Sequence, residues 1–287
     1  MPWIPRGLRE GIVTSRYPRR PDGYGPGFRG SVVVANAPAP EPRIASAVEA
    51  CPTDAITVEN GLPRLDRGRC ILCGRCTELC PELFRFDPDF ETSAERREAL
   101  VVPELVADEA ALILARTELG RAVKALRRSV HIRHVDAGSD GADEWEVAAL
   151  TNPVYDVQRL GIYFTASPRH ADVLLATGVG AAGMLDALRQ TYDVMPEPKV
   201  VIAAGVDAVS GGLLGEGYAS RSGLADSLPV DVFVPGSPPT PFGLLFAILL
   251  AIGRLPRARG SAGGNDWARR TPHGPASAED PTREAGP

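Results

Sequence analysis

Cysteine is missing from most of this chain. All five cysteines lie between residues 51 and 80 of 287, so the rest of the sequence offers none for a disulfide framework. We also expect no secretory signal, because Pro2, Pro5 and several arginines interrupt the N-terminal residues before an apolar stretch can form. Clustered cysteines without a signal indicate a reducing, cytoplasmic setting and metal binding rather than disulfides.

The sequence also lacks an excess of basic residues and a long apolar run. Lys and Arg number 31 against 36 Asp and Glu, a formal net charge of −5, which argues against nucleic-acid binding. The longest apolar run, 242–253, has 12 residues. Because roughly 20 residues are needed to span a bilayer, this run predicts a buried helix instead. We therefore expect no direct membrane span, and membrane association only through partner subunits.

The cysteines that are present follow a specific pattern. Four of them form a C-x2-C-x2-C-x3-C-P run: Cys70, Cys73, Cys76 and Cys80, followed by Pro81. In ferredoxins with two clusters, the first three cysteines of such a run bind one 4Fe-4S cluster, and the fourth binds the other. The first three then need a distant fourth ligand, and Cys51, followed by Pro52, supplies it. A zinc site on four of these cysteines is the alternative, although zinc ribbons rarely use this run.

The spacing also shows that the cysteine run expected upstream of Cys51 is absent. If Cys51 ends an upstream run, the other three cysteines of that run should lie at 41, 44 and 47, but these positions hold Glu41, Ile44 and Ala47. Cys80 then has no cluster to bind and is predicted to be a small buried residue. We expect one 4Fe-4S cluster, on Cys51, Cys70, Cys73 and Cys76.

The remaining sequence predicts a two-domain chain. We expect an extended N-terminal arm over 1–30, a 4Fe-4S domain over 31–100, a connecting helix over 101–128, an α/β domain over 129–255 and a disordered tail over 256–287. In the α/β domain, short apolar strands alternate with helical segments, which argues for a parallel sheet covered on both faces. The expected strands are 130–135, 172–176, 199–203 and 230–234. His131 and His134, on the first of these strands, are predicted to be structural.

Two stretches of the chain resemble known families. Residues 10–90, with Pro26–Gly30 (PGFRG) and Ala50–Ile56 (ACPTDAI), resemble the ferredoxin-like subunit of complex I and of membrane-bound hydrogenases. Residues 129–250, with Arg133–Ser139 (RHVDAGS) and Val230–Pro239 (VDVFVPGSPP), resemble the small subunit of group 4 nickel-iron hydrogenases, the formate hydrogenlyase type, and the NADH-quinone oxidoreductase subunit designated B. The resemblance implies an α+β ferredoxin-like module joined by a helix to an α/β flavodoxin-like parallel-sheet domain.

The second resemblance departs at its own cluster site. The cluster cysteines of that family fall on four positions that hold other residues here: Asp140, Asp143, Asp207 and Ser237. Iron-sulfur clusters select soft thiolates, so an ordinary cluster is not expected at these positions. The aspartates could be hydrogen-bonded or solvated fillers, a site for a hard cation such as Mg or Ca, or, least expected, ligands of an unusual cluster or a catalytic pair. Asp140 and Asp143 could also be caps of the following helix.

Together these features imply an electron-transfer subunit that turns over no substrate alone. The expected complex is membrane-associated and related to hydrogenase or complex I. Its partners would be a large subunit and membrane subunits, and the chain would lie peripherally on the inner face of the cell membrane. The alternative is a structural or redox-sensing adaptor subunit without a role in electron relay.

Overall fold

The computed structural model describes residues 3–20, 22–25, 27–38, 41–103, 114, 117, 119–120, 123 and 129–255. The connecting helix expected over 101–128 falls mostly outside these residues, and the tail expected over 256–287 does so entirely. No helix among the described residues is both long and apolar enough to cross a membrane.

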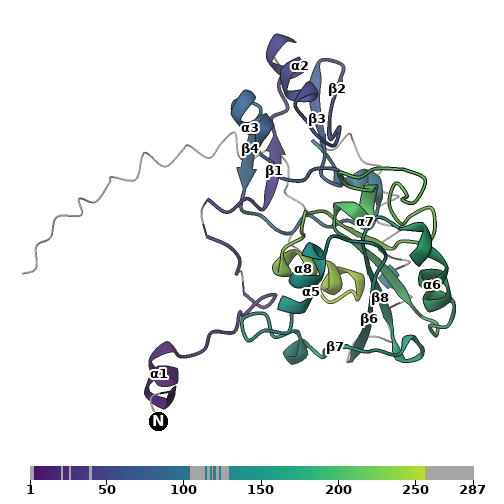
Figure 1. Ribbon diagram of the computed structural model, residues 1–287. Coiled ribbons are helices and arrows are strands. Elements are labelled where there is room, and N and C mark those ends of the chain that lie inside the picture. The colour runs from purple at the N-terminus through teal and green to yellow at the C-terminus, as the bar shows by residue number, and fades with distance from the viewer. Residues whose placement is uncertain are drawn as a thin grey trace, which may run out of the picture. The chain divides into compact units, whose positions relative to one another are not determined.

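A five-stranded parallel sheet organises the C-terminal half (Figure 1). Its strands are β6 (Val130–Asp136), β7 (Ile162–Phe164), β8 (Val173–Thr177), β9 (Val200–Ala204) and β10 (Val232–Val234). The spatial order is β10-β9-β8-β6-β7, so β6 lies inside the sheet, between β7 and β8. Fully buried aliphatic runs such as Val173–Thr177 are typical of parallel strands covered on both faces. The expected parallel α/β sheet is therefore confirmed, and β7 is an additional strand.

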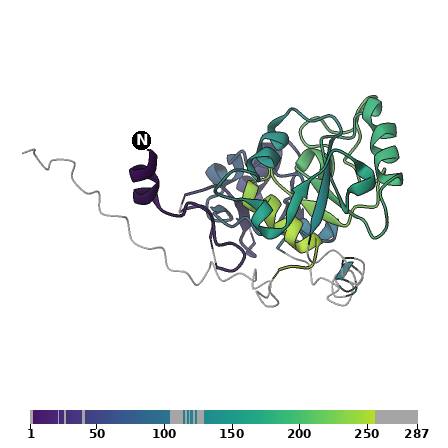
Figure 2. The ribbon, with the colours of Figure 1, turned by 90° about the horizontal axis from the view of Figure 1, so that it is seen from below.

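Helices cover both faces of this sheet (Figure 1 and Figure 2). They are α5 (Ala142–Ala149), α6 (Ala182–Asp193), α7 (Val206–Ser210) and α8 (Pro241–Ala251), with 3-10 turns at Val157–Leu160 and Pro168–His170. Successive residues of β8 point to opposite sides. Val173 and Leu175 join a core with α5 and α8, whereas Leu174 and Ala176 join a core with α6 and α7. The alternation of side chains along a strand thus builds two cores on one sheet.

The apolar run near the C-terminal end forms the buried helix α8. Thr240 caps it, because its hydroxyl accepts a hydrogen bond from the Gly243 N–H over 3.1 Å, and Pro241 occupies the first helical position. Nine of its residues are buried, from Pro241 to Ala251. A helix that is apolar on all sides belongs in a protein core, as expected for this run.

The N-terminal half holds two small antiparallel sheets. One pairs β1 (Ser31–Val34) with β4 (Phe84–Asp87); the other has β2 (Ile56–Glu59), β3 (Leu62–Asp66) and β5 (Val101–Val102). The helices are α1 (Trp3–Glu10), α2 (Glu41–Glu49) and α3 (Arg75–Leu79), with a 3-10 turn at Arg97–Leu100. Two features differ from expectation. The arm expected to be extended contains α1, and Val101–Val102, expected to begin the connecting helix, pairs with β3 instead.

An aromatic cluster and one β-bridge join the two halves. The rings of Phe90 and Phe242 stack with 5.1 Å between their centroids, and Tyr17 packs edge-on against both. Ala94 exchanges backbone hydrogen bonds with Phe233 of β10. These contacts bring the segment that follows β4 against the edge of the parallel sheet.

Candidate iron-sulfur centre

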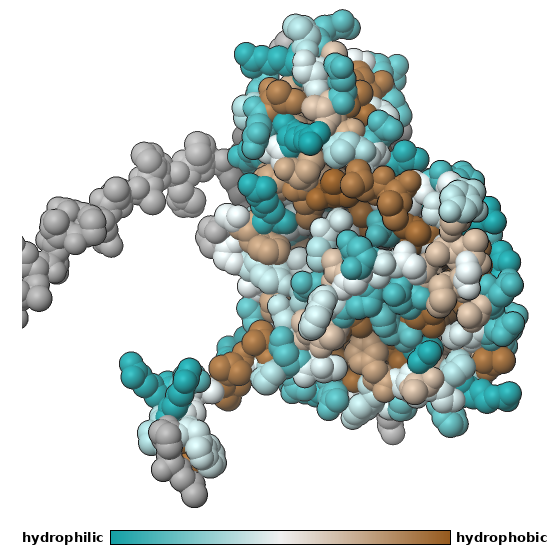
Figure 3. Space-filling model, viewed as in Figure 1, coloured by the Kyte–Doolittle hydropathy of each residue, from teal (hydrophilic) through white to brown (hydrophobic). Residues whose placement is uncertain are grey.

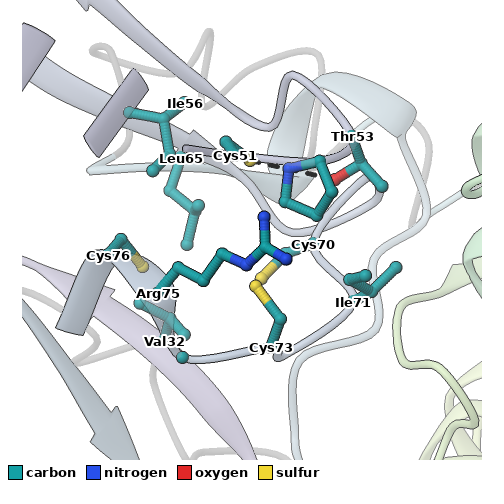
Figure 4. Close-up of a pocket in the computed structure, with 12 residues that line it drawn as sticks. Val32, Cys51, Thr53, Ile56, Leu65, Cys70, Ile71, Cys73, Arg75 and Cys76 are labelled. Atoms are coloured by element: carbon teal, nitrogen blue, oxygen red, sulfur yellow. Dashed lines mark hydrogen bonds between the residues drawn. The ribbon is translucent and has the colours of Figure 1, made fainter. Parts of the chain in front are cut away.

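Four cysteines line one pocket (Figure 4). They are Cys51, which follows α2, Cys70 and Cys73 from the loop after β3, and Cys76 in the first turn of α3. Two residues of this loop, Leu72 and Gly74, have positive φ angles of 56° and 84°. This backbone curves the loop around the pocket and leads into α3, which begins at Arg75 after its N-cap Gly74. The structure thus brings together the four cysteines expected to bind one cluster.

The pocket wall combines apolar side chains with a backbone donor. Val32, Ile56 and Leu65 lie along it, from three different strands. The backbone N–H of Ala55 donates a hydrogen bond to the Cys51 sulfur over 3.3 Å. Hydrogen bonds to the cysteine sulfurs are among the features that tune iron-sulfur clusters.

Burial controls the acidity of two of these thiols. It raises the pKa of Cys70 to about 11 and the pKa of Cys76 to about 12. Neighbouring cysteines raise both values further, because several thiolates so close together would repel one another. Burial thus favours the protonated form of both thiols, and a metal that binds them must displace the protons.

The donor set fits a 4Fe-4S cluster. Four cysteine sulfurs are the ligands that such clusters use, and the C-x2-C-x2-C loop supplies three of them. Among the residues that the structure describes, no three His, Cys, Asp or Glu side chains form a group that could hold a single metal ion. A cluster has four irons and binds each cysteine through a different one, so the fit rests on the sulfur donors and their shared pocket.

Cys80 lies apart from this pocket. It is fully buried, and its thiol donates a hydrogen bond to the backbone carbonyl of Arg43 on α2 over 3.2 Å. Burial also raises the pKa of the Cys80 thiol. Ile44 and Ala47, at two of the positions where an upstream cysteine run would lie, are buried as well. The expectation that Cys80 is a small buried residue is confirmed.

The second candidate site lies at the carboxyl ends of the parallel strands. Asp140 follows β6 and is exposed, and its carboxylate accepts a hydrogen bond from the Ala142 N–H over 2.9 Å. Asp143 lies in the first turn of α5 and is only 5% exposed. Asp207 lies in the first turn of α7, after β9. Ser237 follows β10. Its loop adjoins α7, because the backbone N–H of Val206 donates a hydrogen bond to the Gly236 carbonyl.

The aspartates at these positions influence one another's pKa. Burial raises the pKa of Asp143 to about 8, and repulsion from Asp207, Glu144 and Asp140 adds to the effect. The pKa of Asp207 is also raised, first by burial and then by Asp140 and Glu144. Asp143 packs so tightly against Gly205 that a Cβ on this glycine would lie 2.2 Å from Oδ2. Oxygen donors of this kind do not fit an iron-sulfur cluster.

A polar network beside these aspartates was not foreseen from the sequence. The Glu144 carboxylate accepts hydrogen bonds from the Ser139 hydroxyl, over 2.5 Å, and from the Thr177 hydroxyl. His134 Nε2 lies 3.1 Å from the Thr177 hydroxyl, and burial lowers the pKa of this histidine. The His131 side chain has contacts of its own: its Nδ1 lies 3.6 Å from the Asp172 carboxylate, and its ring stacks on Tyr163 with 5.8 Å between the centroids. Both histidines therefore have structural partners, as expected.

Two family models match the chain. The model of the NADH ubiquinone oxidoreductase 20 kDa subunit matches residues 141–251, and a 4Fe-4S single cluster domain matches residues 64–112. A probable membrane-bound hydrogenase subunit, mbhJ of Pyrococcus furiosus, is 39% identical over 132 residues, which cover 46% of this chain and 79% of mbhJ. The chain belongs to the family of the 20 kDa subunit.

Two further members of this family show the range of its relatives. Formate hydrogenlyase subunit 7 of Escherichia coli is 37% identical over 133 residues, 46% of this chain. The match spans 52% of that subunit, so this chain accounts for about half of its length. The NADH-quinone oxidoreductase subunit designated B, from Geotalea daltonii, is 42% identical over 118 residues, which cover 41% of this chain and 69% of that protein.

The two matched regions divide the candidate sites between them. The 4Fe-4S match contains Cys70, Cys73 and Cys76 but begins after Cys51, which the fold brings to the same pocket. The 20 kDa subunit match contains Asp143, Asp207 and Ser237. Cysteines thus occur in the 4Fe-4S match, whereas the 20 kDa subunit match contains none.

Proposed function

We propose that this chain is the iron-sulfur electron-transfer subunit of a membrane-associated oxidoreductase complex related to hydrogenases or complex I. One 4Fe-4S cluster would be held by Cys51, Cys70, Cys73 and Cys76. The observation that carries this proposal is the single pocket that these four side chains line. The cluster would supply one-electron chemistry, and the chain would hold it without turning over a substrate.

The proposed architecture has two working modules. A ferredoxin-like module over 31–100 would carry the cluster, and a flavodoxin-like domain over 129–255 would present the binding surface for partners. Numbered along the chain, the parallel strands lie in the order 2-1-3-4-5, which is the flavodoxin order and supports this part of the proposal. The arm over 1–30, the connecting helix over 101–128 and the tail over 256–287 complete the proposed organisation.

The second domain would have lost its own cluster. Asp140, Asp143, Asp207 and Ser237 stand at the positions where the resemblance expects cysteines, and they offer only oxygen donors. Iron-sulfur clusters require soft thiolates, and a carboxylate replaces at most an occasional one. The redox centre would therefore lie in the ferredoxin-like module alone.

The names of relatives support the proposed partners. Formate hydrogenlyase subunit 7 and the membrane-bound hydrogenase subunit are, by name, parts of larger complexes. This chain would accordingly bind a large subunit and membrane subunits, and lie peripherally on the inner face of the cell membrane through them. Figure 3 shows a hydrophobic area close to α7. Leu213 and Leu214, which follow α7, are 64% and 74% exposed, and exposed apolar groups of this kind suit a subunit interface.

Iron and sulfide analysis with EPR spectroscopy tests the proposal. The anaerobically purified protein should contain about four irons per chain and give one 4Fe-4S signal after reduction. About eight irons would mean that the aspartate site also holds a cluster. A protein that has the cluster but exchanges no electrons within its complex would support the adaptor alternative.

A further inference from the structure

A second cavity lies beside one ligand of the proposed cluster. Val32 and Cys70 line both this cavity and the cysteine pocket, where Figure 4 shows them. Ser31 and Arg67 line the second cavity from the N-terminal half, and residues 235–236 line it from the α/β domain. Both halves of the chain thus contribute to the surroundings of Cys70.

Arg67 brings a positive charge to this second cavity. Its backbone N–H donates a hydrogen bond to the Leu100 carbonyl over 2.9 Å, and its own carbonyl accepts one from the Cys70 N–H over 3.3 Å. The residue is partly buried, and its Nε is fully buried. The backbone hydrogen bonds therefore fix the base of this side chain beside the ligand Cys70.

The charge of Arg67 acts on the Cys70 sulfur. Burial has the largest effect on this thiol and raises its pKa to about 11, whereas the charge of Arg67 acts in the opposite direction and favours the anion. A 4Fe-4S cluster on four thiolates is anionic, and reduction adds one further negative charge. Because net charge is one of the features that set the potential of a cluster, a nearby cation favours the reduced state.

Other charges near the cysteines are paired or exposed. Asp66, which precedes Arg67, accepts two hydrogen bonds from the Arg97 guanidinium, over 2.6 and 2.8 Å. Arg75, which lines the cysteine pocket, is exposed. The acidic residues within three positions of a proposed ligand are exposed as well: Glu49, Asp54 and Glu78. Because water and salt screen exposed charges more than buried ones, the partly buried Arg67 acts on the cluster site with less screening.

A buried hydroxyl lines the same cavity. Ser31 is 4% exposed, and its Oγ forms no hydrogen bond with any residue that the structure describes. Buried polar atoms without a partner are rare in proteins, so this hydroxyl calls for an acceptor. Val32, the next residue, lines the cysteine pocket, which places the hydroxyl next to the proposed cluster site. Hydrogen bonds to the sulfurs of a cluster also contribute to its potential.

We propose that Arg67 and Ser31 raise the reduction potential of the 4Fe-4S cluster from the side of Cys70 that faces the α/β domain. This inference rests on the proposed function, because it requires a cluster on the four cysteines. Reduction transfers one electron from a donor, which is oxidised, and no bond forms or breaks. Arg67 acts through its charge and Ser31 through its hydroxyl, and neither residue is a ligand. The α/β domain contributes residues 235–236, which limit the access of water to this side of the cluster.

A redox titration of the anaerobically purified full-length protein, followed by EPR, tests this inference. Dithionite supplies the electrons through mediator dyes, and the midpoint potential of the cluster is measured. We expect Arg67→Gln to lower the equilibrium constant for one-electron reduction about threefold to tenfold, which lowers the potential by about 28–59 mV. Ser31→Ala should lower the potential by less, and Arg67→Lys should stay closer to the wild type. Arg189→Gln, at an exposed arginine of α6, is the matched control and should leave the potential unchanged.

Iron content and salt dependence distinguish the outcomes. If the wild type holds no four-iron cluster, the proposed function and this inference both fail. If the cluster is present, an unchanged or higher potential in Arg67→Gln or in Ser31→Ala overturns the inference for that residue alone. The shift in Arg67→Gln should persist between about 0.1 M and 1 M salt, and a shift that disappears at high salt would instead indicate an exposed charge.

Two further variants keep the test decisive if Arg67→Gln assembles no cluster. Arg67→Met removes the charge but keeps a long unbranched side chain, and it should lower the potential as Arg67→Gln does. Ser31→Ala changes no charge and removes only the hydroxyl without a partner, so it should hold four irons. A wild-type potential in both of these variants would overturn the inference as a whole.

Discussion

The thiol of Cys80 and the backbone carbonyl of Arg43 form a hydrogen bond of 3.2 Å. The acceptor lies on α2, between two of the positions where an upstream cysteine run would provide ligands, Glu41 and Ile44. A protein oxygen therefore satisfies the thiol that ferredoxins with two clusters use to bind iron. This contact separates Cys80 from the four cysteines of the pocket and makes the two classes of cysteine distinguishable by mutation.

Cys73→Ala should abolish the 4Fe-4S EPR signal, and Cys80→Ala should preserve it. Cys73 lines the pocket proposed to hold the cluster, whereas Cys80 lies outside it and donates a hydrogen bond to the Arg43 carbonyl. We expect Cys80→Ala to cost about 1–2 kcal/mol of unfolding free energy, because it removes a buried polar contact. Iron content, EPR and thermal unfolding measure these effects. A 4Fe-4S signal that persists in Cys73→Ala would contradict the ligand assignment.

Asp143→Asn should flatten the pH dependence of stability between pH 4 and pH 8. The pKa of Asp143 is raised from 3.8 to about 8, so the folded protein holds a proton that the unfolded chain releases. The contribution of Asp143 to the free energy of unfolding is fully present below the pKa that it has in the unfolded chain. This contribution is lost as the pH rises through the pKa that it has in the folded protein. One pKa unit corresponds to about 1.4 kcal/mol, so we expect a difference on the order of a few kcal/mol at pH 8.

Denaturant unfolding of wild type and Asp143→Asn at pH 5 and pH 8 measures this effect. The matched control is Asp186→Asn, at an exposed position of α6. Equal pH slopes for the wild type and Asp143→Asn would show that Asp143 ionises as easily in the folded protein as in the unfolded chain.

Gly205→Ala should destabilise the α/β domain. The backbone at Gly205 has φ 91° and ψ 151°, a region that residues with a side chain rarely adopt, at a cost of about 1–3 kcal/mol. The added Cβ would also lie 2.2 Å from the Asp143 carboxylate. Thermal unfolding measures the loss. Gly183→Ala, on α6 with no atom within 4 Å of its added Cβ, is the control and should cause none.

Phe90→Ala should loosen the junction between the two halves of the chain. Its ring is 9% exposed and packs on Phe242 and Tyr17. Removal of such a side chain typically costs about 3–5 kcal/mol of unfolding free energy. Calorimetry should show a lower melting temperature, whereas Tyr218→Ala, at a fully exposed tyrosine, should unfold like the wild type. An unchanged melting temperature for Phe90→Ala would contradict the packing role.

Local patterns predicted much of the fold because strands and helices are largely specified by nearby residues. The fully buried strands β8 and β9 are almost entirely aliphatic, and β6 has buried aliphatic residues between polar ones; all three were expected to within one or two residues. Strand β7 has only three residues, too few for a reliable pattern. Helix α1 was missed because Pro5 and Gly7 both argue against a helix, although Trp3, Ile4 and Leu8 fall on one face.

The candidate sites also contain some features that local sequence predicts and others that it does not. The spacing of Cys70, Cys73 and Cys76 is a local signal, and their common pocket with Cys51 agrees with it. The bonds of Glu144 to Ser139 and Thr177 join a loop, a helix and a strand. Thr177 is 33 residues from Glu144 in sequence, and no spacing rule connects such a pair. Contacts of this type become visible only once the strands of the sheet are assembled.

The bridge between Ala94 and Phe233 also bears on how the protein avoids self-association. Strand β10 lies at the edge of the parallel sheet, where unpaired backbone groups can template the addition of a strand from another molecule. The Phe233 N–H and carbonyl both bond to Ala94, over 2.8 and 3.0 Å. The segment after β4 thereby covers the middle of a three-residue edge strand. A chain cut between its two halves would expose this edge, and aggregation of the isolated α/β domain would follow.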